Sequence, residues 1–296
     1  MGELVLEFSI INFSIRNQFS NFQFCNFQCF QNLIIKSLKI ENLTIMTEKN
    51  NKIAPFLLEG NNKVGILLLH GWTSSPNEFR SLANYLNSFG YTVFAPLLRG
   101  HGKKPEDLLN VTWQDWLYDS QKSLEELKKH TDKIFIVGIS MGGNLSLLLS
   151  EDKTVAGIIT MGAAVKYKFH NLAKLSIFLM GLWKIYRRKY YPPWVRKKMG
   201  KRDVYMYYPI QSVKEVMKLT NETKVFLPRV TKPILIMQST TDHMISKKSP
   251  QMIFEGVKSK VKEIFWIENV YHVFVKEKKS REKIGEFIEK ILNSKS

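Results

Sequence analysis

The stretch "DKIFIVGISMGGNLSLLLS" (residues 132–150) joins an apolar, β-branched run to a leucine-rich run through glycines and one serine. The first run predicts a buried strand and the second predicts a helix, so the turn between them lies at the carboxyl end of the strand. Gly138 and Gly142 leave room for a backbone turn that is too sharp for neighbouring side chains, which would expose the hydroxyl of Ser140. We interpret Ser140 as a nucleophile; the alternative is a serine that only caps the helix.

Short apolar runs of the same kind recur along the chain. They lie at residues 63–71, 91–100, 132–140, 155–163, 232–240 and 262–269. None of them alternates polar and apolar residues, so we expect all six to be strands that are buried on both faces of a parallel sheet.

Helix signals separate these runs. Ser75, Pro76 and Glu78 read as an N-cap, a proline at the first helical position and a capping-box glutamate, and Gly90 reads as the helix stop. Residues 112–130 and 280–294 also have helical spacing of apolar positions. The alternation predicts an α/β fold with a doubly wound, mostly parallel sheet, in which reactive groups gather beyond the carboxyl ends of the strands.

A serine nucleophile needs a base and an acid that orients the base. Among six histidines, His272 follows the last apolar run and precedes the final helix, whereas His130 and His170 lie in basic stretches where solvation is expected. Asp242 ends the preceding run and is the expected acid, with Glu268 as its alternative. His243 is an alternative base, but its adjacency to Asp242 is expected to point its side chain elsewhere.

The tetrahedral intermediate also needs hydrogen-bond donors. His70-Gly71-Trp72 ends the first strong strand, and the backbone N–H groups of Trp72 and Met141 are the expected oxyanion donors. We interpret His70 as a brace for this loop rather than as a catalytic group.

The order Ser140, Asp242, His272 and the motifs HGW, LRGHG and GISMGG resemble the α/β-hydrolase superfamily. Within it the chain is similar to bacterial thermostable carboxylesterases and monoacylglycerol lipases, over about residues 52–294 and least between Ala164 and Thr231. The resemblance implies ester hydrolysis through an acyl-enzyme, with no metal or cofactor. Serine at position 140 argues against dehalogenases and epoxide hydrolases, which place aspartate there.

One residue departs from the family pattern. Tyr271 stands immediately before His272, where the family usually has a small residue, and it would narrow the pocket.

The chain divides by composition. Residues 1–45 hold seven of the nineteen phenylalanines and both cysteines, Cys25 and Cys29, and we expect this extension to be dispensable. The α/β-hydrolase core is expected at 46–164 and 232–296, with a cap insertion at 165–231. The two cysteines lack metal-site spacing, no secretory signal or 18-residue apolar run is present, and no cysteine follows residue 45, so we expect a cytoplasmic location.

Most of the net charge of +18 lies in the insertion, since residues 166–202 hold twelve lysines or arginines and no acid. One interpretation is a cap with solvated lysines over an apolar acyl pocket. Another is peripheral contact with an anionic membrane surface. No nucleic-acid motif accompanies the charge, so nucleic acid is not an expected partner.

The expected function is a serine carboxylesterase acting on short- to medium-chain acyl esters. Monoacylglycerol lipase and aryl (cinnamoyl or feruloyl) esterase are alternatives, and thioesterases and acyltransferases use the same triad. A hydrolase-like protein that binds a ligand without catalysis is the alternative from another class. Acyl chain length and oligomeric state stay open at this point.

Overall fold

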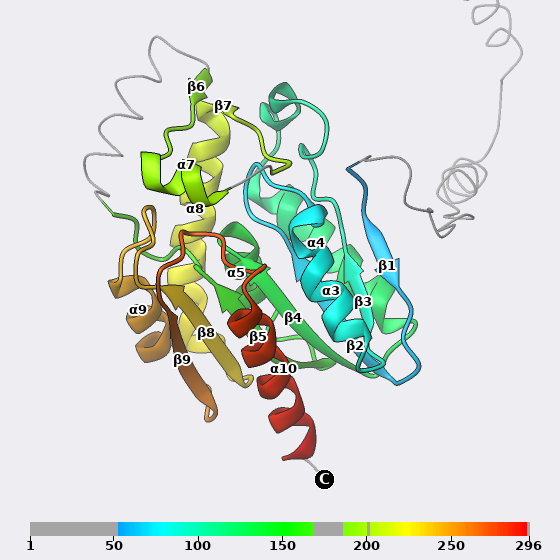
Figure 1. Cartoon of the computed structure of the whole chain (residues 1–296). Coiled ribbons are helices and arrows are strands. Elements are labelled where there is room, and N and C mark those ends of the chain that lie inside the picture. Colours follow the sequence, from blue (N-terminus) through cyan, green and yellow to red (C-terminus); the bar gives the residue numbers. More distant parts are fainter. Residues whose placement is uncertain (1–52, 169–185, 200–201, 295–296) are drawn as a thin grey trace, which may run out of the picture. The chain divides into compact units, whose positions relative to one another are not determined.

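The structure is a computed structural model that describes residues 53–168, 186–199 and 202–294 (Figure 1). Its centre is a seven-stranded sheet in the order β1-β3-β2-β4-β5-β8-β9. The strands are β1 (Phe56–Leu58), β2 (Val64–Leu69), β3 (Thr92–Ala95), β4 (Lys133–Ile139), β5 (Val155–Met161), β8 (Ile234–Ser239) and β9 (Lys262–Ile267). Only β1 is antiparallel to its neighbour, so the predicted mostly parallel α/β sheet is confirmed. The predicted N-terminal extension, its two cysteines and His170 lie outside the described residues.

Each of the six predicted apolar runs contains a strand. The strands β4, β5 and β8 are buried almost throughout, as expected for the middle of a parallel sheet. The prediction of burial on both faces is wrong for β9, which is an edge strand whose Trp266 is 39% exposed. Residue composition alone did not reveal that β9 has a neighbour on one side only.

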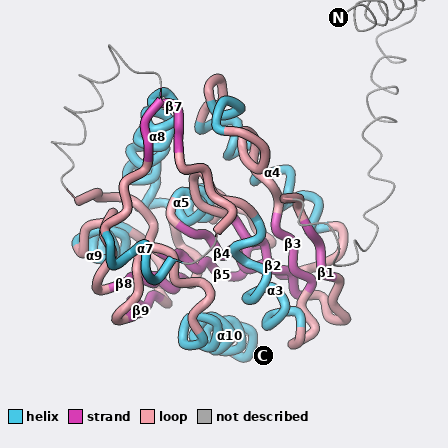
Figure 2. The backbone as a smooth tube through the Cα atoms, turned by 45° about the horizontal axis from the view of Figure 1, so that its top comes forward, coloured by secondary structure: helices cyan, strands magenta, loops and turns pink. Residues whose placement is uncertain are grey.

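Helices cover both faces of the sheet (Figure 2). One face carries α3 (Arg80–Asn87) and α10 (Lys278–Asn293), whose apolar side chains share a core cluster with the sheet. The other face carries α4 (Trp113–Lys128), α5 (Met141–Leu148), α8 (Ile210–Phe226) and α9 (Lys248–Gly256), which contribute to a second cluster. The expected helices at 112–130 and 280–294 correspond to α4 and α10.

The predicted capping box at Ser75 is wrong. Pro76–Phe79 forms a 3₁₀ turn ahead of α3, and the buried Ser75 hydroxyl has no hydrogen-bond partner in the part of the chain that the structure describes. Glu78 instead forms a buried ion pair with Arg202, a residue far along the chain, so its carboxylate does not cap the local helix. The helix stop is confirmed, since Gly90 follows α3 with a left-handed φ of 83°.

The described part of the predicted cap segment has two kinds of structure. A two-stranded ribbon, β6 (Tyr186–Arg188) and β7 (Tyr207–Pro209), flanks the short helix α7 (Pro193–Met199). The following helix α8 packs on the sheet's covering layer: Leu219 is in the second core cluster, and Asn144 Nδ2 donates to Thr223 Oγ1 at 3.0 Å. Figure 1 shows the ribbon and α7 at the top of the view, above the sheet.

Candidate active site

The turn at Ser140 is a strained strand-to-helix junction. Ser140 has φ 52° and ψ −111°, a backbone conformation that residues other than glycine rarely adopt. Its N–H donates to the Met161 carbonyl at 2.9 Å. A Cβ on Gly138 would overlap the carbonyl of Gly142, and a Cβ on Gly142 would overlap the carbonyl of Leu69. Both positions therefore require glycine, as the sequence predicts.

Asp242 and His272 meet beyond the ends of β8 and β9. His272 Nδ1 donates to Asp242 Oδ2 at 2.7 Å, and Gln238 Nε2 donates to the same oxygen at 2.8 Å. The N–H groups of Met244 and Ile245 donate to Oδ1 at 2.8 and 2.9 Å. Burial alone would raise the pKa of Asp242, but the His272 charge, its hydrogen bond and the two backbone donors together lower it to about 2. Asp242 is therefore an ionised acceptor that fixes the orientation of the imidazole.

Gly162 connects this pair to the serine turn. It follows β5 with φ 62°, and a Cβ built on it would lie 3.1 Å from His272 Cε1. Because the Ser140 N–H bonds the preceding residue, Met161, the backbone at 161–162 borders both the serine turn and the imidazole. Glu268, the alternative acid, is exposed, whereas Asp242 makes the hydrogen bond to His272.

His243 packs beside His272 without replacing it. The two rings are 6.3 Å apart and almost perpendicular, and neither ring nitrogen of His243 has a hydrogen-bond partner among the described residues. Burial first, and then the neighbouring His272, lower the pKa of His243 to about 4. His243 is therefore neutral near pH 7. His130 is exposed, as expected.

His70 orients the loop after β2. Its Nε2 accepts from the Leu98 N–H at 3.1 Å, so the proton lies on Nδ1, which donates to the Gly71 carbonyl at 2.9 Å. Burial lowers the pKa of His70 to about 4, which keeps the ring neutral. The predicted bracing role is confirmed. Because the Gly71 carbonyl and the Trp72 N–H share one trans peptide plane, this bond also directs the Trp72 N–H away from His70.

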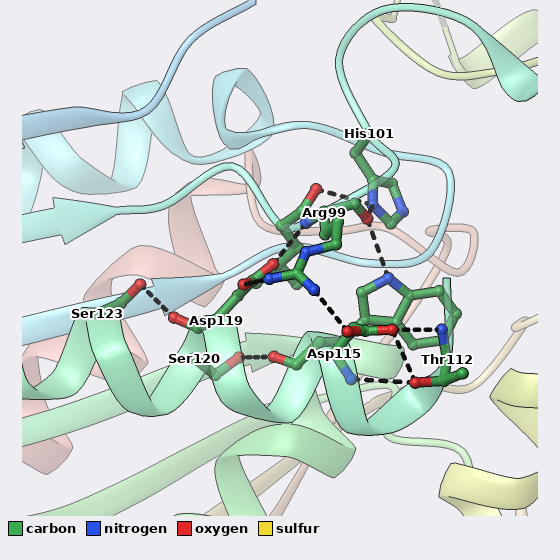
Figure 3. Close-up of polar contacts among 9 residues, drawn as sticks. Arg99, His101, Thr112, Asp115, Asp119, Ser120 and Ser123 are labelled. Carbon is green, nitrogen blue, oxygen red and sulfur yellow. Dashed lines mark hydrogen bonds and ion pairs between the residues drawn. The ribbon is translucent and has the colours of Figure 1, made fainter. Parts of the chain in front are cut away.

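A second histidine holds the next residue of that loop. The Thr73 N–H donates to His101 Nε2 at 2.9 Å, and His101 Nδ1 donates to the Arg99 carbonyl at 3.0 Å. The Arg99 guanidinium pairs with Asp115 and Asp119 of α4 at 2.5 and 3.1 Å (Figure 3). The loop after β2 is thus tied to α4 through His101 and Arg99.

The two expected oxyanion donors belong to segments that adjoin Ser140. Met141 is the first residue of α5, where an N–H has no acceptor within the helix and the helix dipole is positive. Trp72 follows Gly71, on which a Cβ would lie 3.7 Å from Ser140 Cβ. The Tyr271 ring lies near the Arg202 guanidinium, 5.8 Å from its centroid, so this residue faces the insertion.

Three residues at this site have no assigned role in the sequence analysis. Gly162, Gln238 and His101 contact His272, Asp242 and Thr73 respectively. A glycine directly after a buried strand and a histidine inside LRGHG were the available signals. The contact of Gln238 depends on the turn that follows β8, and no pattern in the sequence indicates it.

A serine in a strained turn after β4 and a histidine–carboxylate pair after β8 and β9 define a hydrolase-type site on an α/β-hydrolase fold. A family model described as "Serine aminopeptidase, S33" matches residues 60–279, so the chain belongs to this family.

Known proteins similar to this chain include lipases and esterases. The thermostable monoacylglycerol lipase of Bacillus sp. (strain H-257) is 34% identical, covering 74% of this chain and 86% of its own. The carboxylesterase of Bacillus subtilis (strain 168) is 29% identical, over 80% of this chain and 96% of the carboxylesterase. A solved structure of the metagenome-derived lipolytic enzymes LipS and LipT is 28% identical with a TM-score of 0.75, covering 83% of this chain and 100% of that chain.

The described residues hold no group of three or more histidine, cysteine or acidic side chains placed to bind a metal. None of the described helices combines the length and the apolar character needed to cross a membrane.

Proposed function

We propose that this protein is a serine carboxylesterase. The observation that carries the proposal is the hydrogen-bonded Asp242–His272 pair near Ser140, whose φ is 52° in a turn between Gly138 and Gly142. Ser140 Oγ attacks the ester carbonyl carbon while its proton passes to His272 Nε2. The carbonyl oxygen becomes an oxyanion that accepts from the N–H groups of Trp72 and Met141.

The intermediate then collapses to an acyl-enzyme. The alcohol leaves with the proton from His272, and a water molecule repeats the addition with His272 again as base, releasing the acid and restoring Ser140. Asp242 holds the imidazole in the tautomer that leaves Nε2 free to accept, and its charge stabilises the imidazolium. These steps need no metal or organic cofactor, since this chain supplies each group.

The substrates are short- to medium-chain acyl esters. Likeness to the Bacillus monoacylglycerol lipase supports monoacylglycerol as a natural substrate, and likeness to the Bacillus carboxylesterase supports simpler esters. Aryl esters such as cinnamoyl or feruloyl esters are the alternative acyl class. A non-catalytic ligand-binding protein has no need of the Asp242–His272 pair, which makes it the weaker reading.

Peptide substrates, to which the family description refers, fit this site less well. An aminopeptidase must bind the positively charged α-ammonium group of its substrate. Lys168 Nζ donates to the Asp242 carbonyl and Lys189 Nζ donates to Thr73, whereas the two adjoining carboxylates already have partners: Asp242 bonds His272 and Glu78 pairs with Arg202. Aminoacyl p-nitroanilides are therefore expected to be poor substrates.

The insertion forms a cap over this site. Because α8 packs against α5 within the core, the cap proper ends near Pro209, earlier than the boundary at residue 231 expected from sequence. Its basic residues fit peripheral contact with an anionic membrane surface, although residues 169–185 lie outside the described residues. Binding to anionic vesicles that weakens with salt is expected; no binding at low salt would exclude this contact. A cytoplasmic location and the absence of nucleic-acid partners are further parts of the proposal.

The test is hydrolysis of p-nitrophenyl esters from acetate to palmitate by the wild type, Ser140→Ala and Ser150→Ala. Ser150 lies just after α5 with a buried hydroxyl that has no hydrogen-bond partner among the described residues, so its variant is a matched control. Loss of Ser140 is expected to lower kcat by roughly 10⁶-fold, as in comparable serine hydrolases. Turnover that does not depend on Ser140 would overturn the mechanism. A folded wild type with no turnover on any ester would favour the ligand-binding alternative.

A further inference from the structure

Thr73 has a backbone conformation that its side chain disfavours. Its φ is 63°, although threonine is β-branched and such residues rarely adopt the left-handed region. It is also almost fully buried, with 1% of its surface exposed. A conformation of this kind persists only where surrounding contacts enforce it, and Thr73 directly follows the proposed oxyanion donor Trp72.

Contacts from the core fix one side of this residue. The Thr73 N–H donates to His101 at 2.9 Å, while the Thr73 hydroxyl donates to the Trp72 carbonyl at 2.5 Å. The Trp72 carbonyl and the Thr73 N–H belong to one peptide plane, so both ends of that plane are held. With the Gly71 carbonyl held by His70, two consecutive planes around Trp72 are fixed.

The cap supplies the remaining contacts. Lys189 and Tyr205 adjoin the ends of the β6–β7 ribbon, where the Lys189 N–H donates to the Met206 carbonyl at 2.8 Å. The Tyr205 N–H donates to the Thr73 carbonyl at 3.0 Å, and Lys189 Nζ donates to Thr73 Oγ1. We call Lys189, Tyr205 and Met206 the ribbon foot.

Lys189 is placed for this contact rather than for an ion pair. No carboxylate among the described residues pairs with its ammonium, which lies 5.6 Å from the centroid of the Trp72 ring. Burial lowers the pKa of Lys189 to about 7, in keeping with an ammonium removed from water. Tyr205 is anchored as well, since its hydroxyl donates to the Gly100 carbonyl at 3.2 Å and accepts from the Lys103 N–H at 3.0 Å.

We propose that Lys189 is a positioning residue for catalysis, through which the cap fixes the oxyanion donor. Lys189 donates to the Thr73 hydroxyl, that hydroxyl donates to the Trp72 carbonyl, and the Trp72 N–H is thereby held toward the reacting carbonyl oxygen. The inference rests on the proposed function. It adds that the oxyanion hole is complete only when the ribbon foot is seated on Thr73.

The test compares Lys189→Met and Thr73→Val, which remove the two partners of one contact, with Thr73→Ser, which keeps the hydroxyl. Valine has the shape of threonine, so packing and backbone strain are matched. Lys214→Met, at an exposed position of α8, is the control for loss of a lysine charge away from Thr73. The readouts are kcat and KM on p-nitrophenyl butyrate, and the inhibition constant of an alkyl trifluoromethyl ketone, which adds to serine and forms an oxyanion.

Removing an oxyanion donor lowers kcat by roughly 10²–10³-fold, so displacing one donor from its best position is expected to lower kcat by about tenfold. Lys189→Met and Thr73→Val should each lower kcat by about that factor, leave KM within about twofold, and weaken the ketone as much as kcat falls. The double variant should be no worse than Thr73→Val alone, because that substitution already removes the acceptor of the Lys189 hydrogen bond. Thr73→Ser and Lys214→Met should behave like the wild type.

Unchanged kcat in Lys189→Met, a change confined to KM, or losses that multiply in the double variant would each overturn the inference. Those results leave the proposed function intact, because it fails only if the wild type shows no Ser140-dependent turnover. If Lys189→Met does not fold, the comparison of Thr73→Val with Thr73→Ser still decides, since equal activities of the two would exclude a role for the hydroxyl.

Discussion

Replacing His70 should remove part of the acid sensitivity of the fold. His70 is fully buried, and burial lowers its pKa from 6.5 to about 4. The unfolded chain therefore binds a proton at this histidine below about pH 6.5, whereas the folded chain stays neutral until about pH 4. The stability that this difference provides is fully present above pH 6.5 and declines as the pH falls toward 4.

The size of the effect follows from the two pKa values. Between about pH 7.5 and about pH 5 the wild type should lose roughly 2 kcal/mol of unfolding free energy through His70 alone. His101 and His243 have lowered pKa values and contribute with the same sign, so the total loss in the wild type is larger. Comparison with a variant isolates the part that belongs to His70.

The assay is urea unfolding of the wild type and His70→Asn at both pH values, with His130→Gln as the control at an exposed histidine. His70→Asn should be less stable near neutral pH, because the Gly71 carbonyl and the Leu98 N–H lose their partner. Its further loss on acidification should be smaller than that of the wild type by roughly 2 kcal/mol. Equal pH dependence in the two proteins would refute the assignment of a buried neutral His70. His101→Gln offers the same comparison should His70→Asn not fold.

Three further outcomes are expected. Gly142→Ala should lower the free energy of unfolding in urea by about 1–3 kcal/mol and abolish activity, because its Cβ would overlap the Leu69 carbonyl. A variant as stable as the wild type would contradict the close approach of Gly142 to Leu69. Asp242→Asn should keep KM but lower kcat by roughly 10⁴-fold, since the amide can favour the wrong histidine tautomer; a small change in kcat would remove Asp242 from the mechanism. Deletion of residues 1–45 should leave the unfolding midpoint and esterase activity unchanged, and loss of either would show that the extension is needed.

The sheet could be predicted from sequence because its strands are short, apolar and separated by helix signals. Two kinds of error remained. The edge position of β9 depends on which strand neighbours which, and the run "KEIFWIEN" does not record it. The three-residue strand β1 is too short to have a distinctive period, so its pairing with β3 went unpredicted.

The residues of the site likewise divide into those that the sequence predicts and those that it does not. Ser140, Asp242 and His272 follow strand ends, so the fold rule for parallel sheets placed them at one edge. Glu78 read as a local capping residue, but Arg202, far along the chain, competes for its carboxylate. The contacts of Lys189 and Tyr205 with Thr73 depend on how the insertion folds back over the loop after β2, which no local pattern encodes.

The left-handed backbone at Ser140 and Thr73 bears on how this protein can evolve. Each non-glycine residue in such a conformation costs on the order of 1–3 kcal/mol, and glycine would relieve that cost. Glycine at position 140 would remove the nucleophile, and at position 73 it would remove the hydroxyl that the cap contacts. Selection for heat resistance alone would therefore favour a substitution that inactivates the enzyme at position 140 and one that slows it at position 73. A screen for thermostable variants needs an activity requirement to retain both residues.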